Sequence, residues 1–311
     1  MTRVLITGGT GVLGRALARS LSRVHEVWTT SRRDTGDDRH VAADLTADDA
    51  ARAIVTRVQP NMVVHLAGTT RGSPPELFDA NVVTTVNLLQ AVDPSTPVIA
   101  VGSAAEYGPG TGDLIAETAP LRPVSEYGRS KAAGSLAATA IARRRGIPLT
   151  IVRPFNVVGP EMPTTSPLGN IGAQLRAAQG TSTDRLRTGR LDVVRDFIPI
   201  GFVVEALTAV VADPQPDGVF NICSGVGLRL RDVVEALAGR LGVAPEICVD
   251  PDLAALPAAE RVVGDPARLT TRYGISVTTD PERVADAIVG TAQAPPAVPS
   301  ARPTDTTTED R

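Results

Sequence analysis

The sequence predicts an α/β protein with a doubly wound parallel sheet and a smaller, mostly C-terminal α/β domain. Short apolar runs alternate with helix-like segments through the first half of the chain. These runs are continuously apolar, as expected of parallel strands that are covered on both faces. With 311 residues, the chain is long enough for one large domain and a smaller one.

The first half gives the clearest pattern of elements. Apolar runs predict strands at residues 4–7, 26–31, 61–68, 97–103 and 149–154. Helical patterns lie between them at residues 12–23, 48–58, 77–92 and 127–146. After residue 154 the pattern becomes irregular, with helices expected near 171–179 and 203–212 and a strand-like run at 219–225.

This pattern also divides the chain. We expect a dinucleotide-binding domain at 1–154 with a return around 191–215, and a substrate domain at 155–190 and 216–290. Residues 291–311 are rich in Pro and Thr and have few apolar side chains, which predicts a disordered tail.

Composition excludes several classes of function. A net charge of −3 argues against nucleic acid binding, and no apolar run approaches the ~18 residues of a membrane span. Two cysteines outside any C-x-x-C pattern fit the reducing cytoplasm. The histidines His25, His40 and His65 are scattered without ligand spacing, so no metal site is expected.

A glycine-rich turn follows the first strand. The stretch TGGTGVLG, residues 7–14, carries Gly8, Gly11 and Gly14, with Val12 and Leu13 opening the next helix. A glycine turn with no ligand would have the same composition. Its place between a strand and a helix favours a Rossmann-type phosphate loop, in which the helix N-terminus binds pyrophosphate.

A second motif indicates acid–base chemistry. SEYGRSK holds Tyr127 and Lys131 four residues apart, on one face of a helix. A nearby ammonium favours the phenolate and is expected to lower the tyrosine pKa from its usual ~10. Ser103 ends the preceding strand. A plain surface pair is the alternative, but the position of the motif after the fourth strand favours catalysis.

Together these motifs resemble the extended short-chain dehydrogenase/reductase family of nucleotide-sugar epimerases, dehydratases and reductases. The resemblance spans residues 3–285, and LRPVSEYGRSK, RPFNVVGP and RVVGDPARL look closest to GDP-4-keto-6-deoxy-mannose reductases and related 4-ketoreductases. It implies that Ser103 hydrogen-bonds the substrate oxygen, Tyr127 transfers the proton and Lys131 orients the coenzyme, whose nicotinamide carries the hydride. It also implies a homodimer.

The choice of coenzyme depends on the end of the second strand. Ser31, Arg32 and Arg33 come first there, and Asp34 follows late. Two guanidiniums suit a 2′-phosphate, which favours NADP, with NAD possible; an ordinary basic loop is the alternative. The resemblance also implies coenzyme contacts from Asp44, Leu45, Leu66, Ala67 and Gly68. For the small residues Ala67 and Gly68, plain strand-end packing is the alternative.

The segment GSAAEYG limits the chemistry further. Related dehydratases carry an acid at one or both of the positions of Ala104 and Ala105, and the 3,5-epimerising reductases that make fucose carry a cysteine at the second. Neither side chain is present, which argues against elimination and against epimerisation at C3 or C5. Glu106 either points away or contacts substrate, and Tyr107 is expected to pack in or beside the pocket.

On the substrate side, Asn156 and Arg195 match family positions that contact the sugar or its diphosphate. A structural ion pair between Arg195 and Asp192 or Asp196 is the alternative. We therefore expect NADPH-dependent reduction of the C4 ketone of a nucleotide-activated 4-keto-6-deoxyhexose. An NDP-sugar 4-epimerase with tightly bound NAD is the first alternative, and a non-catalytic dinucleotide-sensing regulator the second. The nucleotide, the sugar and the C4 stereochemistry stay open.

Overall fold

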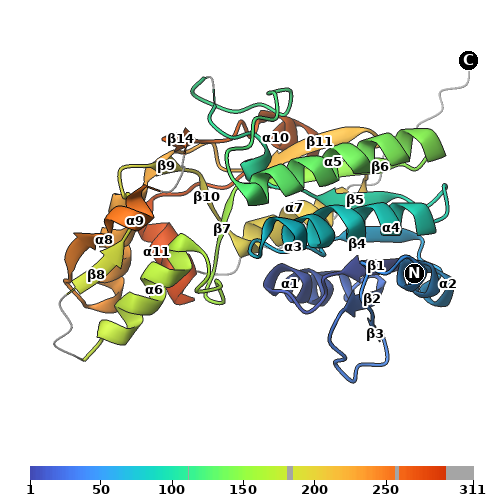
Figure 1. Ribbon diagram of the computed structural model, residues 1–311, viewed down its shortest axis with the longest axis horizontal. Coiled ribbons are helices and arrows are strands. Elements are labelled where there is room, and N and C mark those ends of the chain that lie inside the picture. The colour runs from blue at the N-terminus through green and yellow to red at the C-terminus, as the bar shows by residue number, and fades with distance from the viewer. Residues whose placement is uncertain (111, 181–184, 256–258, 292–311) are drawn as a thin grey trace, which may run out of the picture.

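A parallel sheet forms the centre of the molecule (Figure 1). The computed structural model describes residues 1–110, 112–180, 185–255 and 259–291, and within them the sheet has seven strands in the order β11-β6-β5-β4-β1-β2-β3. All neighbouring strands are parallel. The strands are β1 (Arg3–Thr7), β2 (Glu26–Ser31), β3 (His40–Ala42), β4 (Met62–His65), β5 (Val98–Val101), β6 (Leu149–Pro154) and β11 (Gly218–Ile222).

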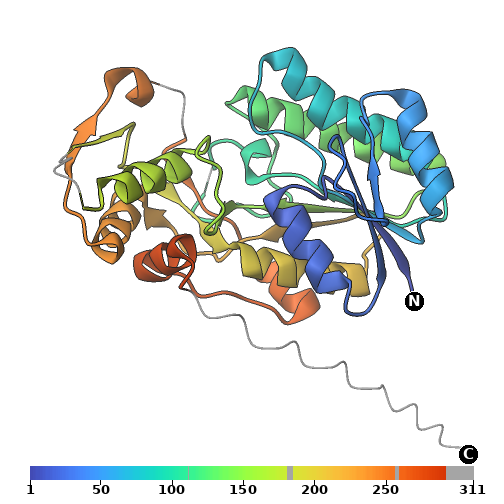
Figure 2. The ribbon, with the colours of Figure 1, turned by 90° about the horizontal axis from the view of Figure 1, so that it is seen from below.

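Helices cover both faces of this sheet (Figure 2). Successive strand residues face opposite sides: Val4 and Ile6 join one core cluster and Leu5 joins the other. The first cluster is covered by α1 (Val12–Leu21), α7 (Ile200–Ala212) and α10 (Ala267–Tyr273). The second is covered by α2 (Asp48–Val58), α4 (Thr84–Ala91) and α5 (Glu126–Arg145). The predicted doubly wound α/β fold is confirmed.

The helix predicted at 77–92 is divided into three pieces. It begins as α3 (Pro74–Phe78), widens into the π-helical turn η1 (Asp79–Val83) and continues as α4. The Ser73 side chain and Glu76 form a capping box at its start. The widened turn carries Asn81, whose side chain is 3% exposed and hydrogen-bonds to two other segments.

The smaller lobe is built around α6 (Pro167–Ala178), α8 (Leu230–Leu241) and α11 (Pro281–Val289), which share an apolar core. Its short strands pair over long sequence distances. β8 (Arg185–Thr188) pairs with β13 (Glu246–Val249), and β7 (Asn156–Val158) with β10 (Phe197–Pro199). β9 (Val194–Arg195) lies between β12 (Leu228–Arg229) and β14 (Arg261–Val262), and α9 spans Pro251–Ala254.

One part of the expected domain division differs. Residues 216–290 are expected in the substrate domain; within them, β11 pairs with β6 in the large sheet and α10 packs against the core of that sheet. β11 covers the edge of β6, which is buried along its whole length. Except for Thr291, the tail 291–311 lies outside the described residues.

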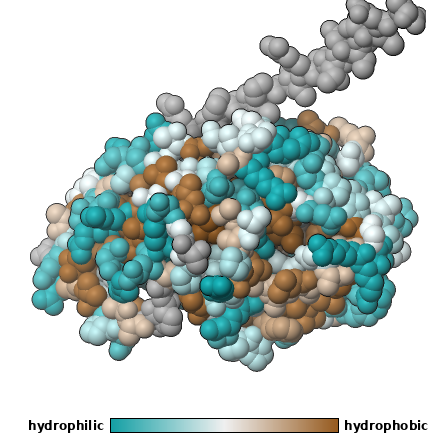
Figure 3. All heavy atoms as spheres, turned by 90° about the horizontal axis from the view of Figure 1, so that it is seen from above, coloured by the Kyte–Doolittle hydropathy of each residue, from teal (hydrophilic) through white to brown (hydrophobic). Residues whose placement is uncertain are grey.

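The surface mixes residue types. The face drawn in Figure 3 alternates hydrophilic and hydrophobic side chains. None of the helices that the structure describes is both long and apolar enough to cross a membrane.

Candidate active site

The glycine turn between β1 and α1 is tightly packed. Gly8 has φ 70°, which favours glycine, and its oxygen accepts a hydrogen bond from the Gly11 nitrogen (3.0 Å). A Cβ on Gly14 would lie 2.3 Å from that same oxygen. Gly11 is exposed, and Val12 and Leu13 are half-buried at the start of α1. The turn thus leaves bare backbone at a helix N-terminus, which fits a dinucleotide pyrophosphate.

The end of β4 closes one side of this turn. The Thr7 hydroxyl oxygen accepts hydrogen bonds from the nitrogens of Leu66 (3.2 Å) and Ala67 (3.1 Å). A Cβ on Gly8 would lie 2.9 Å from the Ala67 nitrogen, and one on Gly68 would lie 2.5 Å from Asn81 Oδ1. The small residues expected along the coenzyme therefore lie beside the glycine turn.

A buried hydrogen-bonded chain extends from Thr7 to the π-helical turn. The Thr7 hydroxyl donates to His65 Nδ1 (2.8 Å), and His65 Nε2 donates to the Thr85 hydroxyl (3.0 Å). Thr85 in turn donates to the Asn81 carbonyl (3.0 Å). Burial, helped by the charge of Lys131, lowers the pKa of His65 to about 3, so the ring is neutral.

The Asn81 side chain joins the site from the helix above it. Its amide nitrogen donates to the Thr69 carbonyl (2.9 Å) and to the Ser130 hydroxyl (2.9 Å) on α5, and its oxygen accepts from the Thr69 nitrogen (3.0 Å). Neither His65 nor Asn81 was predicted as a site residue. A lone histidine in an apolar strand and an asparagine within a helical pattern give no distinctive signal.

The end of β2 presents Ser31, Arg32 and Arg33. Arg32 and Arg33 are exposed, while Ser31 is half-buried and donates to the Arg33 carbonyl (3.0 Å). Asp44 is exposed; hydrogen bonds from Thr46, and after them the charge of Arg32, lower its pKa. Leu45 is only 5% exposed and packs in the core, so it offers little surface to an adenine ring.

The structure brings Ser103, Tyr127 and Lys131 together. Ser103 caps the 3₁₀ turn η2 (Ala104–Glu106) just after β5, and its hydroxyl hydrogen-bonds to Tyr127 near the start of α5. Lys131 lies one turn further along, and its ammonium donates to the Val101 carbonyl (2.6 Å). Tyr127 and Lys131 are both half-buried.

The pKa of Tyr127 moves opposite to the sequence-based expectation. Burial raises it and Glu106 adds to the rise, while the Ser103 hydrogen bond acts to lower it. Burial also lowers the pKa of Lys131, and the charge of Glu106 opposes that change. Because the Lys131 ammonium points at the Val101 carbonyl, the loss of solvent around Tyr127 has the largest effect on the pKa of its phenol. Tyr127 is therefore a neutral phenol near neutral pH.

Glu106 points into the protein interior. Its side chain is fully buried; one oxygen accepts from the Ser103 nitrogen (2.8 Å) and the other from Arg153 Nε (2.9 Å). A Cβ on Gly102 would lie 2.3 Å from its Oε1, so the glycine makes room for it. Glu106 therefore points away, as one of the two alternatives expected, and its carboxylate lies beneath Ser103.

The ion pair continues into a longer network. Arg153 on β6 also donates to the Tyr107 hydroxyl (2.9 Å), and Tyr107 donates to Asn221 Oδ1 (2.7 Å) on β11. Glu117 accepts from the Asn221 backbone nitrogen (2.9 Å). Burial raises the pKa of Tyr107 to about 12, so it does not titrate near neutrality. Tyr107, at 2% exposure, is a packing residue rather than a pocket wall.

The two side chains expected to contact the substrate already form hydrogen bonds within the protein. The Asn156 amide nitrogen donates to the Asp196 carbonyl (2.9 Å). Arg195 donates to the carbonyls of Ala259 (2.7 Å) and Val194 (2.8 Å). The alternative of an ion pair between Arg195 and Asp192 or Asp196 is wrong, because other donors hold both carboxylates.

Asp196 is a buried hub on this side. Its carboxylate accepts from the Ser224 nitrogen (2.9 Å) and hydroxyl (2.6 Å), the Gly225 nitrogen (3.0 Å) and the Gly264 nitrogen (3.3 Å). Burial raises its pKa, and these donors oppose the rise. Asp196 thus joins the loops that follow β11 and β14, and no sequence signal distinguished it from its neighbour Arg195.

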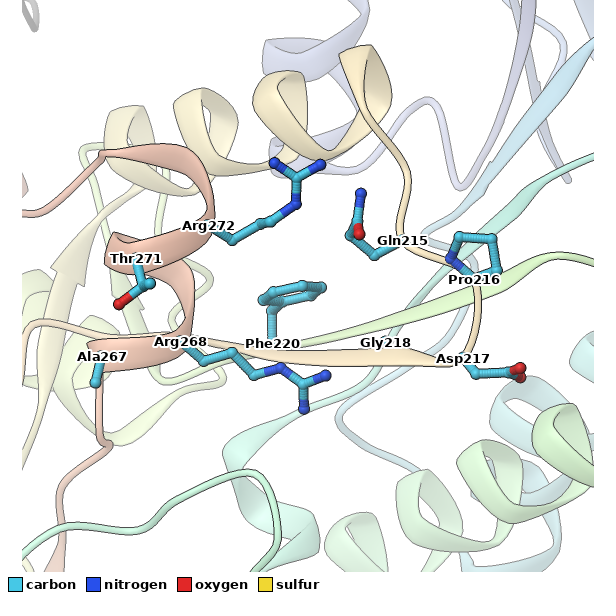
Figure 4. Close-up of a pocket in the computed structure, with 9 residues that line it drawn as sticks. All are labelled: Gln215, Pro216, Asp217, Gly218, Phe220, Ala267, Arg268, Thr271 and Arg272. Carbon is cyan, nitrogen blue, oxygen red and sulfur yellow. The ribbon is translucent and has the colours of Figure 1, made fainter.

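A separate hollow of about 560 Å³ lies at the other end of the sheet (Figure 4). It is lined by the turn before β11 and by α10, with Arg268 and Arg272 on either side of the Phe220 ring. Arg268 stacks over that ring at 5.1 Å, and Arg272 pairs with Asp213. The hollow begins at the amino end of β11, whereas Ser103 follows the carboxyl end of β5, so it is not the candidate active site.

Known proteins share this architecture. A sequence model of the NAD dependent epimerase/dehydratase family matches residues 4–223. The dTDP-6-deoxy-L-talose 4-dehydrogenase (NAD(P)(+)) of Kitasatospora kifunensis is 34% identical over 257 residues, covering 79% of this chain and 81% of that protein.

Two solved structures extend the comparison. RMD from Pseudomonas aeruginosa complexed with NADPH has a TM-score of 0.80 and 26% identity, covering 94% of this chain and 97% of that one. The Thermus thermophilus UDP-glucose 4-epimerase complex with NAD has a TM-score of 0.81 and 26% identity, covering 93% and 98%. The expected nicotinamide coenzyme agrees with both. The family match covers most of the chain, and we conclude that the protein belongs to the NAD dependent epimerase/dehydratase family.

Proposed function

We propose that the protein uses NADPH to reduce the C4 ketone of a nucleotide-activated 4-keto-6-deoxyhexose. The burial of Glu106 carries the proposal. It is the one carboxylate in the segment 102–108, and it is ion-paired beneath Ser103. Ala104 and Ala105 contribute no acid or base. The segment therefore supports hydride transfer with a single proton, rather than elimination or epimerisation at a neighbouring carbon.

The protein's own residues supply the proton and the geometry. Ser103 donates a hydrogen bond to the ketone oxygen, and the neutral Tyr127 phenol transfers its proton to that oxygen. Lys131, whose ammonium donates to the Val101 carbonyl, would orient the coenzyme beside Tyr127. When bound, NADPH supplies the hydride that forms the new C–H bond at C4. The raised pKa of Tyr127 suits this direction, because reduction starts from the protonated phenol.

The glycine turn and the end of β2 would hold the coenzyme. The bare backbone of residues 8–14 would hold the pyrophosphate, and the exposed Arg32 and Arg33 would bind the 2′-phosphate of the adenosine ribose. Exchanging both arginines for alanine should raise the KM for NADPH by roughly tenfold or more, because charge-assisted hydrogen bonds to the 2′-phosphate are lost. The KM for NADH should change little. Equal effects on the two coenzymes would contradict the assignment.

The likeness to the Kitasatospora kifunensis enzyme supports a C4 reaction. Its name describes oxidation at C4 of a 6-deoxy sugar nucleotide, the reverse of the reduction proposed here. Asn156 and Arg195 are proposed to contact the nucleotide sugar, Arg195 after giving up part of its carbonyl contacts.

The test is NADPH oxidation with dTDP-, GDP- and UDP-linked 4-keto-6-deoxyhexoses, followed by NMR of the product. Tyr127→Phe should lower kcat by roughly a hundredfold or more, because the proton donor is lost. Tyr273→Phe is the matched control: its hydroxyl bonds to the Asp213 carbonyl on α7's C-terminal side, away from Ser103, and kcat should be unchanged. Full activity of Tyr127→Phe would contradict the proposed role.

A 4-epimerase is the second candidate, favoured by the similarity to the Thermus thermophilus enzyme with NAD. An epimerase oxidises and then re-reduces its substrate, so it retains its coenzyme and needs no added reductant. Purified protein carrying one NAD per chain, and converting an NDP-hexose without NADPH, would support the epimerase and contradict the reductase.

We also propose a homodimer that uses α5 and its neighbour α3. These helices pack together, and they carry Leu136 (63% exposed) and Phe78 (50% exposed). Light scattering on the purified protein should give twice the chain mass. Leu136→Glu should shift that mass toward the monomer.

A further inference from the structure

The turn that carries Ser31, Arg32 and Arg33 is anchored from behind by a histidine. His40 begins β3 and is the register partner of Thr29 on β2. Its side chain is 6% exposed, although it borders an exposed segment. The sequence pattern does not predict this strand and indicates no role for His40.

Both ring nitrogens of His40 are engaged. Nε2 lies 2.8 Å from the Arg33 carbonyl, and Nδ1 lies 2.8 Å from the Thr29 hydroxyl. A carbonyl oxygen only accepts, so Nε2 carries the proton, and in the neutral ring Nδ1 accepts from Thr29. The Ser31 hydroxyl also donates to the Arg33 carbonyl (3.0 Å) and lies 3.3 Å from Nε2. The backbone of Arg33 is therefore held by two donors.

Thr29, the hydrogen-bond partner of His40, also packs against the glycine turn. A Cβ on Gly9 would lie 2.5 Å from the Thr29 Cβ, so the loop rests on Thr29. The Gly9 nitrogen donates to the Thr30 carbonyl (3.1 Å). His40 thus links the residues beneath the pyrophosphate loop to the backbone that carries the two arginines.

We propose that His40 is a positioning residue that sets the preference for a 2′-phosphorylated adenosine ribose. The inference rests on the NADPH assignment made above. By fixing the Arg33 carbonyl, His40 holds the Cα atoms of Arg32 and Arg33 at the end of β2 before the ligand arrives. Less conformational freedom is then lost on binding, and the guanidiniums meet the 2′-phosphate from a defined backbone.

A matched pair of variants separates this role from general stability. His40→Gln carries an amide that reaches the position of Nε2 and can donate to the Arg33 carbonyl. His40→Asn carries the same amide one methylene shorter, so it stays near Thr29 and does not reach that carbonyl. His25→Asn, on the turn after α1, is the control for a histidine outside the coenzyme segment.

The measurement is calorimetric binding of 2′,5′-ADP and of 5′-AMP, which needs no sugar substrate. Wild type, His40→Gln and His25→Asn should all bind 2′,5′-ADP more tightly than 5′-AMP. In His40→Asn the preference for 2′,5′-ADP over 5′-AMP should fall by roughly tenfold, which is the worth of one charge-assisted hydrogen bond between an arginine and the 2′-phosphate. Its affinity for 5′-AMP should be retained. Retained 5′-AMP binding shows that the variant is folded.

The outcomes are distinct. A wild-type ratio near one would overturn the NADPH assignment and this inference with it. A normal wild-type ratio that His40→Asn preserves would overturn the inference alone. Equal losses in His40→Asn and His40→Gln would also overturn it, because the reach to the Arg33 carbonyl would then be irrelevant. Absence of turnover with every 4-ketosugar would contradict the proposed reaction without affecting either binding result.

Discussion

Replacing Glu106 by Gln tests the buried network beneath Ser103. The change keeps the size of the side chain and an oxygen that accepts the Ser103 N–H, but it removes the charge that faces Arg153. The Arg153 side chain is only 6% exposed, so water does not replace the lost partner. The variant therefore isolates the electrostatic part of the network.

The structure sets the expected magnitude. Breaking a buried ion pair by removing one partner costs about 3–5 kcal/mol. Arg153 keeps its hydrogen bond to Tyr107 and its contact with that ring (4.8 Å), so we expect the lower end, about 3 kcal/mol of unfolding free energy in urea. Adding Arg153→Met should restore part of the loss. Glu246→Gln, in an exposed pair with Arg185, should cost under about 0.5 kcal/mol.

The same variant changes the pH dependence. The Glu106 charge raises the pKa of Tyr127, so removing it lowers that pKa. Reduction requires the protonated phenol, and the alkaline limb of kcat for ketone reduction should therefore move to lower pH. A Glu106→Gln protein as stable as wild type, with an unmoved alkaline limb, would refute the reasoning.

Three further predictions follow from single positions. Burial lowers the pKa of His65 from 6.5 to about 3, so between these pH values the unfolded chain binds a proton that the native state excludes. As the pH falls below 6.5, the unfolding free energy of the wild type should therefore drop by up to about 1.4 kcal/mol per pH unit relative to His65→Gln, and this loss should level off near pH 3. Urea titrations from pH 7 to 3 measure this difference, and parallel curves would contradict it. Gly14→Ala forces a Cβ to within 2.3 Å of the Gly8 oxygen and should weaken NADPH binding by roughly tenfold or more in fluorescence titration, whereas Gly239→Ala, where a Cβ meets open space, should not. Asp196→Ala leaves buried donors without an acceptor and should lower the unfolding free energy by about 3 kcal/mol; a loss under about 1 kcal/mol would show that water replaces the carboxylate.

Local signals were enough to predict most strands of the main sheet. Strands 26–31 and 149–154 and the helix 48–58 have the predicted bounds, because apolar continuity and helical period are properties of neighbouring residues. The short strand at His40–Ala42 was not predicted, because three residues are too few to show an apolar pattern. The strands of the smaller lobe were not predicted for another reason. β8 and β13, for example, are stabilised by each other across about sixty residues of chain.

The candidate site divides in the same way. Ser103, Tyr127 and Lys131 follow from motif spacing, and the structure brings them together. The direction in which Glu106 points does not follow from spacing. It depends on the 3₁₀ turn after Ser103 and on Arg153, which comes from another strand. The shift of the Tyr127 pKa likewise depends on burial, which the sequence does not report.

The Tyr107–Asn221 hydrogen bond has a consequence for the order in which the protein is made. It joins residues 114 positions apart, whereas the contact between Thr7 and Ala67 at the glycine turn spans only 60. Because the glycine turn is complete at residue 67 and the last strand of the sheet ends at residue 222, a growing chain can form that turn well before this strand leaves the ribosome. The network beneath Ser103 is assembled only after that strand arrives, so the candidate coenzyme-binding turn can form before the candidate catalytic group is supported.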